Sequence, residues 1–198
     1  MMLIEQTTVP GAALPVQEFK DHLRLGTAFA DVTAQDAALE SYLRSAMAAI
    51  EGRIGKALIQ RDFLWSITHW RGQGEQPLPI APVSALASVT LIDKSGTPTV
   101  VDPGRYSLTQ DIQRPRLVAA GASLPSIPTG GSVEIVFTAG FGTDWTNIPV
   151  DLQQAVLLLA AQYYEFRHEQ SGTEAMPFGV MALIERWRTV RMLGGGQS

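Results

Sequence analysis

Two side chains near the end of a helical segment have the spacing of metal ligands. Glu165 and His168 are three residues apart, which is the Glu-x-x-His spacing of di-metal carboxylate bundles. Such a site needs a second Glu-x-x-His pair and two further glutamates on other helices, and the sequence has no second pair. We therefore expect a solvated helix end here, and we assign no catalytic, cofactor-binding or metal-binding residue.

Three glycine-containing segments lack the pattern of a catalytic or phosphate-binding loop. The segment 121–125 contains a serine but not the second glycine of a nucleophile elbow. The segment 140–142 lacks a third glycine, and Pro77 stands where the dinucleotide fingerprint after Gly72 and Gly74 needs glycine. Cysteine is absent, which excludes a thiol nucleophile and a Cys-ligated zinc.

The end of the chain combines an aromatic residue with positive charge. Arg186, Trp187, Arg188 and Arg191 lie close together, and no acidic residue follows Glu185. Cations are favoured near a helix C-terminus, which is a purely structural explanation. Trp and Arg are also enriched at interface hot spots, which favours a docking segment. The residues alone leave both interpretations open.

The composition excludes several classes of protein. The chain has 198 residues, 45% of them hydrophobic and 17% charged. This pattern excludes extensive disorder, and so few charges suggest that partners cover part of the surface. The net charge of -4 argues against nucleic-acid binding by phosphate neutralisation. The longest apolar run, 155–161, is too short to span a membrane, and we expect no secretory signal.

The first part of the chain has the apolar spacing of helices. A short helix is predicted over 16–24, with Val16, Phe19 and Leu23 on one face. A longer helix is predicted from Thr33, a candidate N-cap. Its apolar positions recur at helical spacing: Leu39, Tyr42, Leu43, Ala46, Met47, Ile50 and Ile54.

The middle of the chain is predicted to form a small antiparallel sheet of short strands. Apolar and polar residues alternate there, as in strands with one buried face. The clearest alternating positions are Phe63, Trp65 and Ile67, and Val133, Ile135 and Phe137. Asp93 and Gly96 suit a short hairpin loop between two of the strands.

The chain returns to helix after Pro149, a residue tolerated in a first helical turn. An apolar stripe runs through Leu152, Ala155, Val156, Leu159, Ala160 and Tyr163. Leu157 and Leu158 add a second apolar face, so we expect this helix to be buried in a bundle or an oligomer. A last helix is predicted over 178–192.

These elements predict an α+β fold in which terminal helices pack as a small bundle with an inserted small antiparallel β-sheet. We expect a single domain over 1–198, with helical parts at 15–56 and 149–192 and the β insertion at about 59–139. The ends 1–14 and 193–198 are expected to be flexible and to become ordered on assembly. Leu43, Met47 and Ile50 should face Val156, Leu159 and Tyr163 across a helix pair.

The order and spacing of several segments resemble those of the head–tail connector (adaptor) proteins of tailed phages, in the branch that also serves prophage-like gene transfer agents. The resemblance extends over about 15–193, nearly the whole chain. The segments that carry it are 16–24, 51–59, Pro79-Ile80-Ala81-Pro82-Val83, Arg114-Pro115-Arg116-Leu117, 138–142 leading to Ile148-Pro149, 151–159 and 177–183. No segment among them is catalytic.

The resemblance implies a structural protein of the virion neck, present in the host cytoplasm during assembly. Such proteins form a ring, commonly a dodecamer, beneath the portal; the ring extends the DNA channel and offers its far face to a stopper or tail-completion protein. The family is not enzymatic, uses no cofactor and lets DNA pass without specific binding. Its C-terminal segment commonly reaches the portal, which implies docking by Arg186, Trp187, Arg188, Arg191, Met192 and Leu193.

Two alternative functions belong to other classes. A small metal- or acid–base-dependent enzyme would need Glu165 and His168 to converge with carboxylates such as Glu40 or Glu51. A DNA-binding module would need a basic face that reads a groove, which the acidic balance disfavours.

Overall fold

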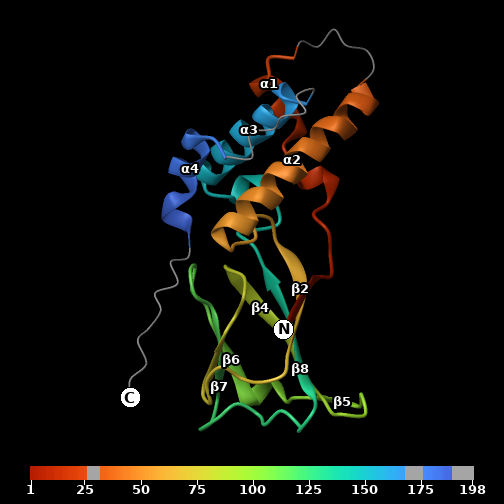
Figure 1. Cartoon of the computed structure of the whole chain (residues 1–198), viewed down its shortest axis with the longest axis vertical. Helices are drawn as coiled ribbons and strands as arrows, with labels where there is room; N and C mark the ends of the chain where they lie inside the picture. Colours follow the sequence, from red (N-terminus) through yellow and green to blue (C-terminus); the bar gives the residue numbers. More distant parts are fainter. Residues whose placement is uncertain (26–31, 168–175, 189–198) are drawn as a thin grey trace.

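The computed structural model describes residues 1–25, 32–167 and 176–188. In Figure 1 a helical part lies above a β part. The helical part combines segments from both ends of the described chain, and most of the β part comes from the middle. The predicted α+β architecture is therefore confirmed.

Among the described residues, four α-helices and three short 3-10 turns make up the helical part. They are α1 (Val16–His22), α2 (Val32–Ile54), α3 (Val150–Glu165) and α4 (Phe178–Ile184), with η1 (Gly11–Ala13), η3 (Trp145–Asn147) and η4 (Glu185–Trp187). The predicted N-cap, Thr33, lies inside α2, because the helix already begins at Val32. The predicted last helix continues as η4 after Ile184, and its final residues, 189–192, lie outside the described residues.

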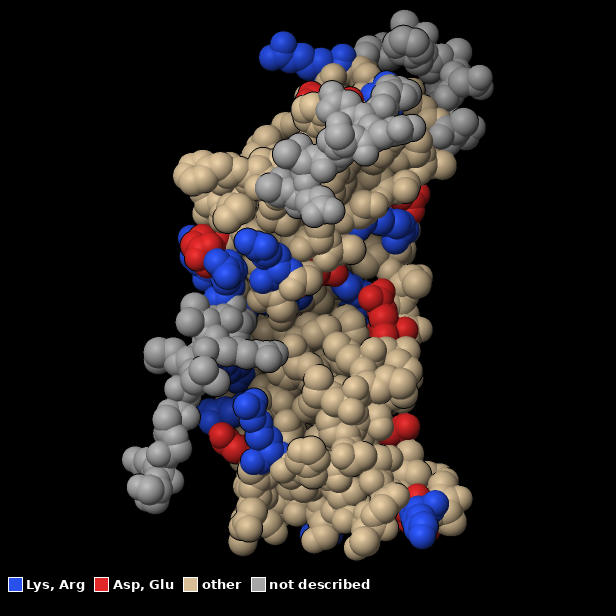
Figure 2. All heavy atoms as spheres, in the orientation of Figure 1, with Lys and Arg blue, Asp and Glu red and all other residues tan. Residues whose placement is uncertain are grey.

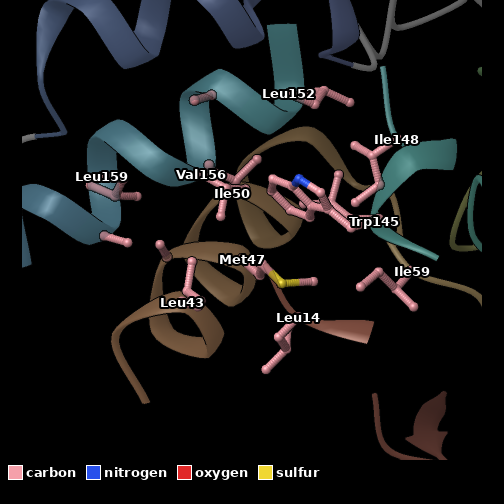
Figure 3. Packing of buried hydrophobic residues seen from close by; sticks show 14 of the residues in the cluster. Leu14, Leu43, Met47, Ile50, Ile59, Trp145, Ile148, Leu152, Val156 and Leu159 are labelled. Carbon is pink, nitrogen blue, oxygen red and sulfur yellow. The ribbon is translucent and has the colours of Figure 1, made fainter. Parts of the chain in front are cut away.

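The core of the helical part forms between α2 and α3. Leu43, Met47 and Ile50 of α2 and Val156 and Leu159 of α3 are all buried in one cluster, and Figure 3 shows these side chains pointing toward one another. Tyr163 packs on the same cluster while staying half-buried. The predicted helix pair is therefore confirmed.

The β part contains two antiparallel sheets. Its elements are β1 (Met2–Glu5), β2 (Arg61–Ile67), β3 (Glu75–Pro77), β4 (Val83–Ile92), β5 (Pro98–Val100), β6 (Tyr106–Thr109), β7 (Arg116–Ala119) and β8 (Ser132–Ala139), with the 3-10 turn η2 (Pro103–Arg105). One sheet has the order β1-β2-β8-β4-β5 and the other the order β3-β7-β6. The predicted small sheet is thus divided into two.

Alternation in β2 and β8 produces the core of the β part. Phe63, Trp65 and Ile67 are buried, as are Val133, Ile135 and Phe137, while the residues between them are half-buried. The rings of Phe63 and Phe137 stack across the two strands with centroids 5.7 Å apart. The alternation along β2 and β8 therefore places the larger apolar side chains on one face of the sheet.

The hairpin between β4 and β5 has the predicted turn chemistry. The Asp93 carboxylate accepts hydrogen bonds from the backbone N–H groups of Ser95 and Thr97 at 2.8 and 2.9 Å. Gly96 has a φ of 87°, a left-handed conformation that a side chain would disfavour.

The N-terminal residues differ from the expectation of a flexible end. Met2–Glu5 form β1, which pairs with β2 from Met2 opposite Ser66 to Glu5 opposite Phe63. Residues 1–5 show no period-two alternation, because residues 1–4 are all apolar. An edge strand whose two faces are both partly exposed does not require alternation. The other expected flexible end, 193–198, lies outside the described residues.

Candidate interaction surfaces

Trp187 joins η4 to the beginning of α3. Its indole Nε1 donates a hydrogen bond to Asp151 Oδ2 at 2.7 Å, and its ring meets Phe141 edge-to-face at 5.4 Å between centroids. The residue is 9% exposed and belongs to the helical core. In this chain Trp187 therefore anchors the C-terminal segment to its own fold rather than standing free as a docking side chain.

The arginines beside Trp187 are more exposed. The Arg186 side chain is 70% exposed, and its Nε lies 2.7 Å from Asp151 Oδ2. Arg188 pairs with Glu185 at 3.1 Å. The structure therefore brings Arg186, Trp187 and Arg188 together.

The remaining residues assigned to docking, Arg191, Met192 and Leu193, lie outside the described residues. The partner Asp151 was missed because it is 36 positions from Trp187 in the sequence. One sequence feature could have pointed to Asp151: it lies in the first turn of α3, where acidic residues are favoured.

The helical part also presents apolar side chains that the sequence did not single out as a surface. Val150 at the start of α3 is 78% exposed and Phe178 at the start of α4 is 86% exposed. No charged residue occurs in 152–164 or 178–184. Figure 2 shows that charged side chains on the visible face gather mainly where the helical part meets the sheets. Exposed apolar side chains such as Phe178, in a segment without charge, are typical of protein interfaces.

An ion network occupies the junction between the helical and β parts. Arg61 of β2 contacts Glu51 of α2 at 2.6 Å and Glu5 of β1 at 2.9 Å. Glu51 also accepts a 2.7 Å hydrogen bond from the backbone N–H of Leu58. Burial alone would lower the pKa of Arg61, but the hydrogen bonds and charges of Glu51 and Glu5 outweigh it and raise the pKa. This network ties three elements together.

Lys56, in the same junction, is 1% exposed. Its Nζ donates a 2.7 Å hydrogen bond to Gln113 Oε1. Burial lowers the pKa of Lys56, although the nearby carboxylate of Asp111 partly opposes this shift. The pKa of Asp111 is itself lowered by hydrogen bonds from the backbone N–H groups of Arg114 and Gln113. The loop between β6 and β7 is therefore held against the end of α2.

The carboxylates considered for an enzyme have other partners. Glu40 pairs with Arg44 at 2.6 Å and Glu51 pairs with Arg61. They are eleven residues apart on one helix, which separates them by about 16 Å along its axis. Glu165 is exposed and His168 lies outside the described residues. Within the part of the chain that the structure describes, no group of three His, Asp or Glu residues could hold a metal ion.

The glycine segments have structural roles. A Cβ on Gly140, whose φ is 139°, would collide with the backbone of Gln60, and one on Gly142 would collide with Asn147. These glycines allow the chain to pass closely from β8 to α3. In the segment 121–125, Leu124 is buried, and the carbonyl of Pro125 accepts the indole N–H of Trp70 at 2.7 Å.

Comparisons with known proteins identify the class of this chain. It matches a chain in the neck of an empty gene transfer agent (GTA) particle, computed with C6 symmetry, at 64% identity and a TM-score of 0.89, over 98% of this chain and 99% of that one. It also matches a chain in the virion of a native GTA particle, at 64% identity and a TM-score of 0.87, over the same shares. A third match, in the neck of a native GTA particle computed with C12 symmetry, has 59% identity and a TM-score of 0.85, again over 98% and 99%.

No protein-family model and no curated protein matches the chain. The fold and these matches define a small structural protein of a particle neck. The chain belongs to the head–tail connector (adaptor) family of tailed phages, in the gene transfer agent branch. The resemblance and the expected location in the virion neck are thereby confirmed. None of the described helices is long and apolar enough to cross a membrane.

Proposed function

We propose that the chain is the adaptor subunit that joins the portal of a phage-like particle to the proteins below it. The observation that carries this proposal is the 64% identity to a neck component over 98% of the chain. At that identity the surfaces that make assembly contacts are expected to be retained along with the fold. The role is structural, and no enzymatic reaction is proposed.

The subunits form a closed ring, and the C12 symmetry of a matched neck supports a dodecamer. The apolar surface of the helical part, where Val150 and Phe178 are 78% and 86% exposed, supplies contact area for a neighbour. Contact with a neighbour in the ring would remove these side chains from water. A cyclic ring is a closed assembly and does not grow into a filament.

The C-terminal segment docks on the portal. Arg186 and Arg188 are exposed at the root of this segment, and Arg191, Met192 and Leu193 follow in the sequence. The buried Trp187 fixes where the segment leaves the body of the protein. Repetition of this contact around a ring strengthens attachment through avidity.

The ring continues the DNA channel below the portal and presents its far face to a stopper or tail-completion protein. The net charge of -4 suits a conduit, because an acidic protein holds the phosphate backbone weakly. DNA therefore passes through the ring without specific binding.

The test mixes the purified chain with purified portal protein and measures the products by native mass spectrometry and electron microscopy. We expect a ring of twelve copies, as the C12 neck indicates, stacked on the portal. The chain without portal, at the same concentration, serves as the control. A chain that never binds the portal at any concentration would contradict the proposal.

A further inference from the structure

The outer edge of β1 offers unpaired backbone groups. In the five-stranded sheet β1 is the terminal strand, with β2 on its inner side. The backbone N–H of Gln6 bonds to the carbonyl of Asp62 at 2.8 Å. Because hydrogen-bonded pairs alternate along an antiparallel ladder, Ile4 bonds to β2 and the N–H and C=O groups of Leu3 and Glu5 point away from it.

This edge is short and ends in one charged residue, Glu5, which is paired with Arg61, but it lacks two of the usual protective residues. Met1, Met2, Leu3 and Ile4 are 89%, 54%, 38% and 44% exposed, and residues 1–5 contain no lysine and no proline. Natural sheets protect free edges with such residues, because an exposed apolar edge pairs with other chains.

The opposite edge of the same sheet is protected. In β5, Thr99 lies opposite Leu91 of β4, and the bond from Val101 N–H to the Val89 carbonyl sets the alternation. The outward positions of β5 are therefore Pro98 and Val100. Pro98 has no N–H to donate, so this edge lacks a backbone donor that pairing with another strand requires.

A hollow lies beside the free edge of β1, between the sheet and the end of α2. Its apolar lining includes Leu3, Phe63 and Ile80, and Ala48 and Gly52 line it from α2. A Cβ built on Gly52 would meet no atom within 4 Å. Glycine costs helix stability relative to alanine, and here it leaves the hollow open.

The side chains of an added strand would enter this hollow. Leu3 pairs with Trp65 and Glu5 with Phe63, so Leu3 and Glu5 share the face of the sheet that carries these buried rings. Residues placed opposite Leu3 and Glu5 in an added strand would point to the same face. Glu5 and Glu51 both pair with Arg61 at the hollow, and Lys56, which also lines it, brings the formal charge of the lining to zero, so the hollow favours an uncharged apolar side chain.

We propose that the free edge of β1 and the hollow beside it bind an extended, apolar segment of a different neck protein by strand addition. Backbone hydrogen bonds to Leu3 and Glu5 provide affinity, and the hollow selects an apolar side chain at every second position. The choice of a different protein rests on the proposed ring. Pairing of two β1 edges is isologous and needs a two-fold axis between the two copies, and neighbouring copies in a cyclic ring are not related in that way. Of the other edges in the two sheets, β5 is blocked by Pro98 and β3 by Pro77, and pairing with β6 of a neighbouring copy is the contrary outcome of the crosslinking test.

Amide hydrogen exchange at single-residue resolution tests the contact. It compares the free chain with the chain in purified particles. We expect the Leu3 and Glu5 amides to exchange rapidly in the free chain and on the order of tenfold more slowly in the particle. The Ile4 amide, which already bonds to β2, is the internal reference and should change little. Unchanged exchange at Leu3 and Glu5 in the particle overturns the proposal.

Two variants separate strand addition from folding. Leu3→Pro removes an outward N–H while leaving the ladder to β2 intact, and Leu3→Ala keeps that N–H. Gly52→Leu fills the hollow, and Ala38→Leu, an exposed position on the same helix, is its control. We expect the proline variant to keep the wild-type unfolding midpoint and Gly52→Leu to keep or raise it, because leucine is a better helix former than glycine. Both variants should lose the protection of Glu5 in particles. Retained protection in both variants overturns the proposal.

Crosslinking identifies the source of the strand. A photo-crosslinking amino acid in place of Met2 should join the chain, within purified particles, to an apolar segment of a different neck protein. A crosslink only to another copy of this chain overturns the assignment. Native mass spectrometry of the same particles reports the ring independently, so an intact ring with unprotected Leu3 and Glu5 amides rejects this site and leaves the proposed function standing.

Discussion

Trp187 donates its indole N–H to the carboxylate of Asp151 over 2.7 Å, which links the last described turn to the first turn of α3. Arg186 contacts the same carboxylate oxygen at 2.7 Å and lies over the Trp187 ring, 5.0 Å from its centroid. The basic end of the chain is therefore attached to the helical part at its root.

This attachment predicts that Trp187→Ala destabilises the protein. Truncating a buried tryptophan to alanine costs about 3–5 kcal/mol of unfolding free energy. Trp187→Phe keeps an aromatic ring beside Phe141 but loses the hydrogen bond to a charged group, about 1.5–3 kcal/mol, together with part of the buried ring. Urea denaturation measures both, and Arg188→Ala, at an exposed side chain, is the control. A Trp187→Ala protein with the wild-type urea midpoint would show that this contact does not hold the segment.

The helix pair predicts a second stability effect. Leu159 is 1% exposed between α2 and α3, so Leu159→Ala should cost about 2–5 kcal/mol. Leu157 on the same helix is half-buried, and Leu157→Ala should cost clearly less. Equal losses for the two variants in thermal or urea unfolding would contradict the packing described.

Lys56 predicts a pH-dependent stability. Its pKa is lowered in the folded protein by burial, so the unfolded chain binds more protons between the folded pKa and the ordinary value of 10.5. The destabilisation from burying the charge is therefore complete at low pH and disappears as the pH rises toward 10.5. Lys56→Met should raise the unfolding midpoint at neutral pH, and its advantage over wild type should shrink as the pH rises. An advantage that does not change with pH would show that the charge is not the cause.

Portal docking predicts a specific loss of binding. A protein ending at Arg188 keeps Trp187 and should fold normally, but it should bind purified portal at least about tenfold more weakly, since aromatic and arginine anchors dominate interfaces. Arg186→Gln with Arg188→Gln should weaken binding in the same direction. Lys94→Gln, in the hairpin between β4 and β5 of the β part, is the matched control. If the shortened protein binds portal at wild-type strength, the docking surface is elsewhere.

The proposed channel predicts weak interaction with DNA. The protein should show no tight binding to duplex DNA whose strength falls steeply with salt, because few phosphates would be neutralised. Electrophoretic mobility shifts at low and moderate salt test this, with a basic protein of similar size as the positive control. Tight, salt-sensitive binding would contradict the proposed conduit.

Elements with strong periodicity were predictable from the sequence. The spacing of Leu43, Met47 and Ile50 predicted one side of the helical core, and Leu159 on α3 predicted the other. The alternation around Ile135 predicted β8. In these segments the local pattern and the tertiary packing agree, so the pattern was sufficient.

Features that depend on distant partners were not predictable. β1 pairs with a strand about sixty residues later, and nothing in residues 2–5 alternates. The assignment of strands to two sheets depends on pairings such as Glu75 with Val118, which local patterns do not contain. The position of Trp187 likewise depends on Asp151, which is distant in the sequence. A tryptophan among arginines indicated an interface, but it did not indicate which surface would cover the ring.

The close passage at Gly140 determines how mechanical force travels through the subunit. There the chain returns from β8 to α3 alongside the segment from α2 to β2. Backbone hydrogen bonds join the junction, among them those from Gln60 to Gly142, from Phe141 to Leu58 and from Ala57 to Ala81. A force applied to the sheets is therefore transmitted to α2 and α3 through a hydrogen-bonded junction and not through flexible linkers. Stretched from either end, the subunit should resist extension as one body.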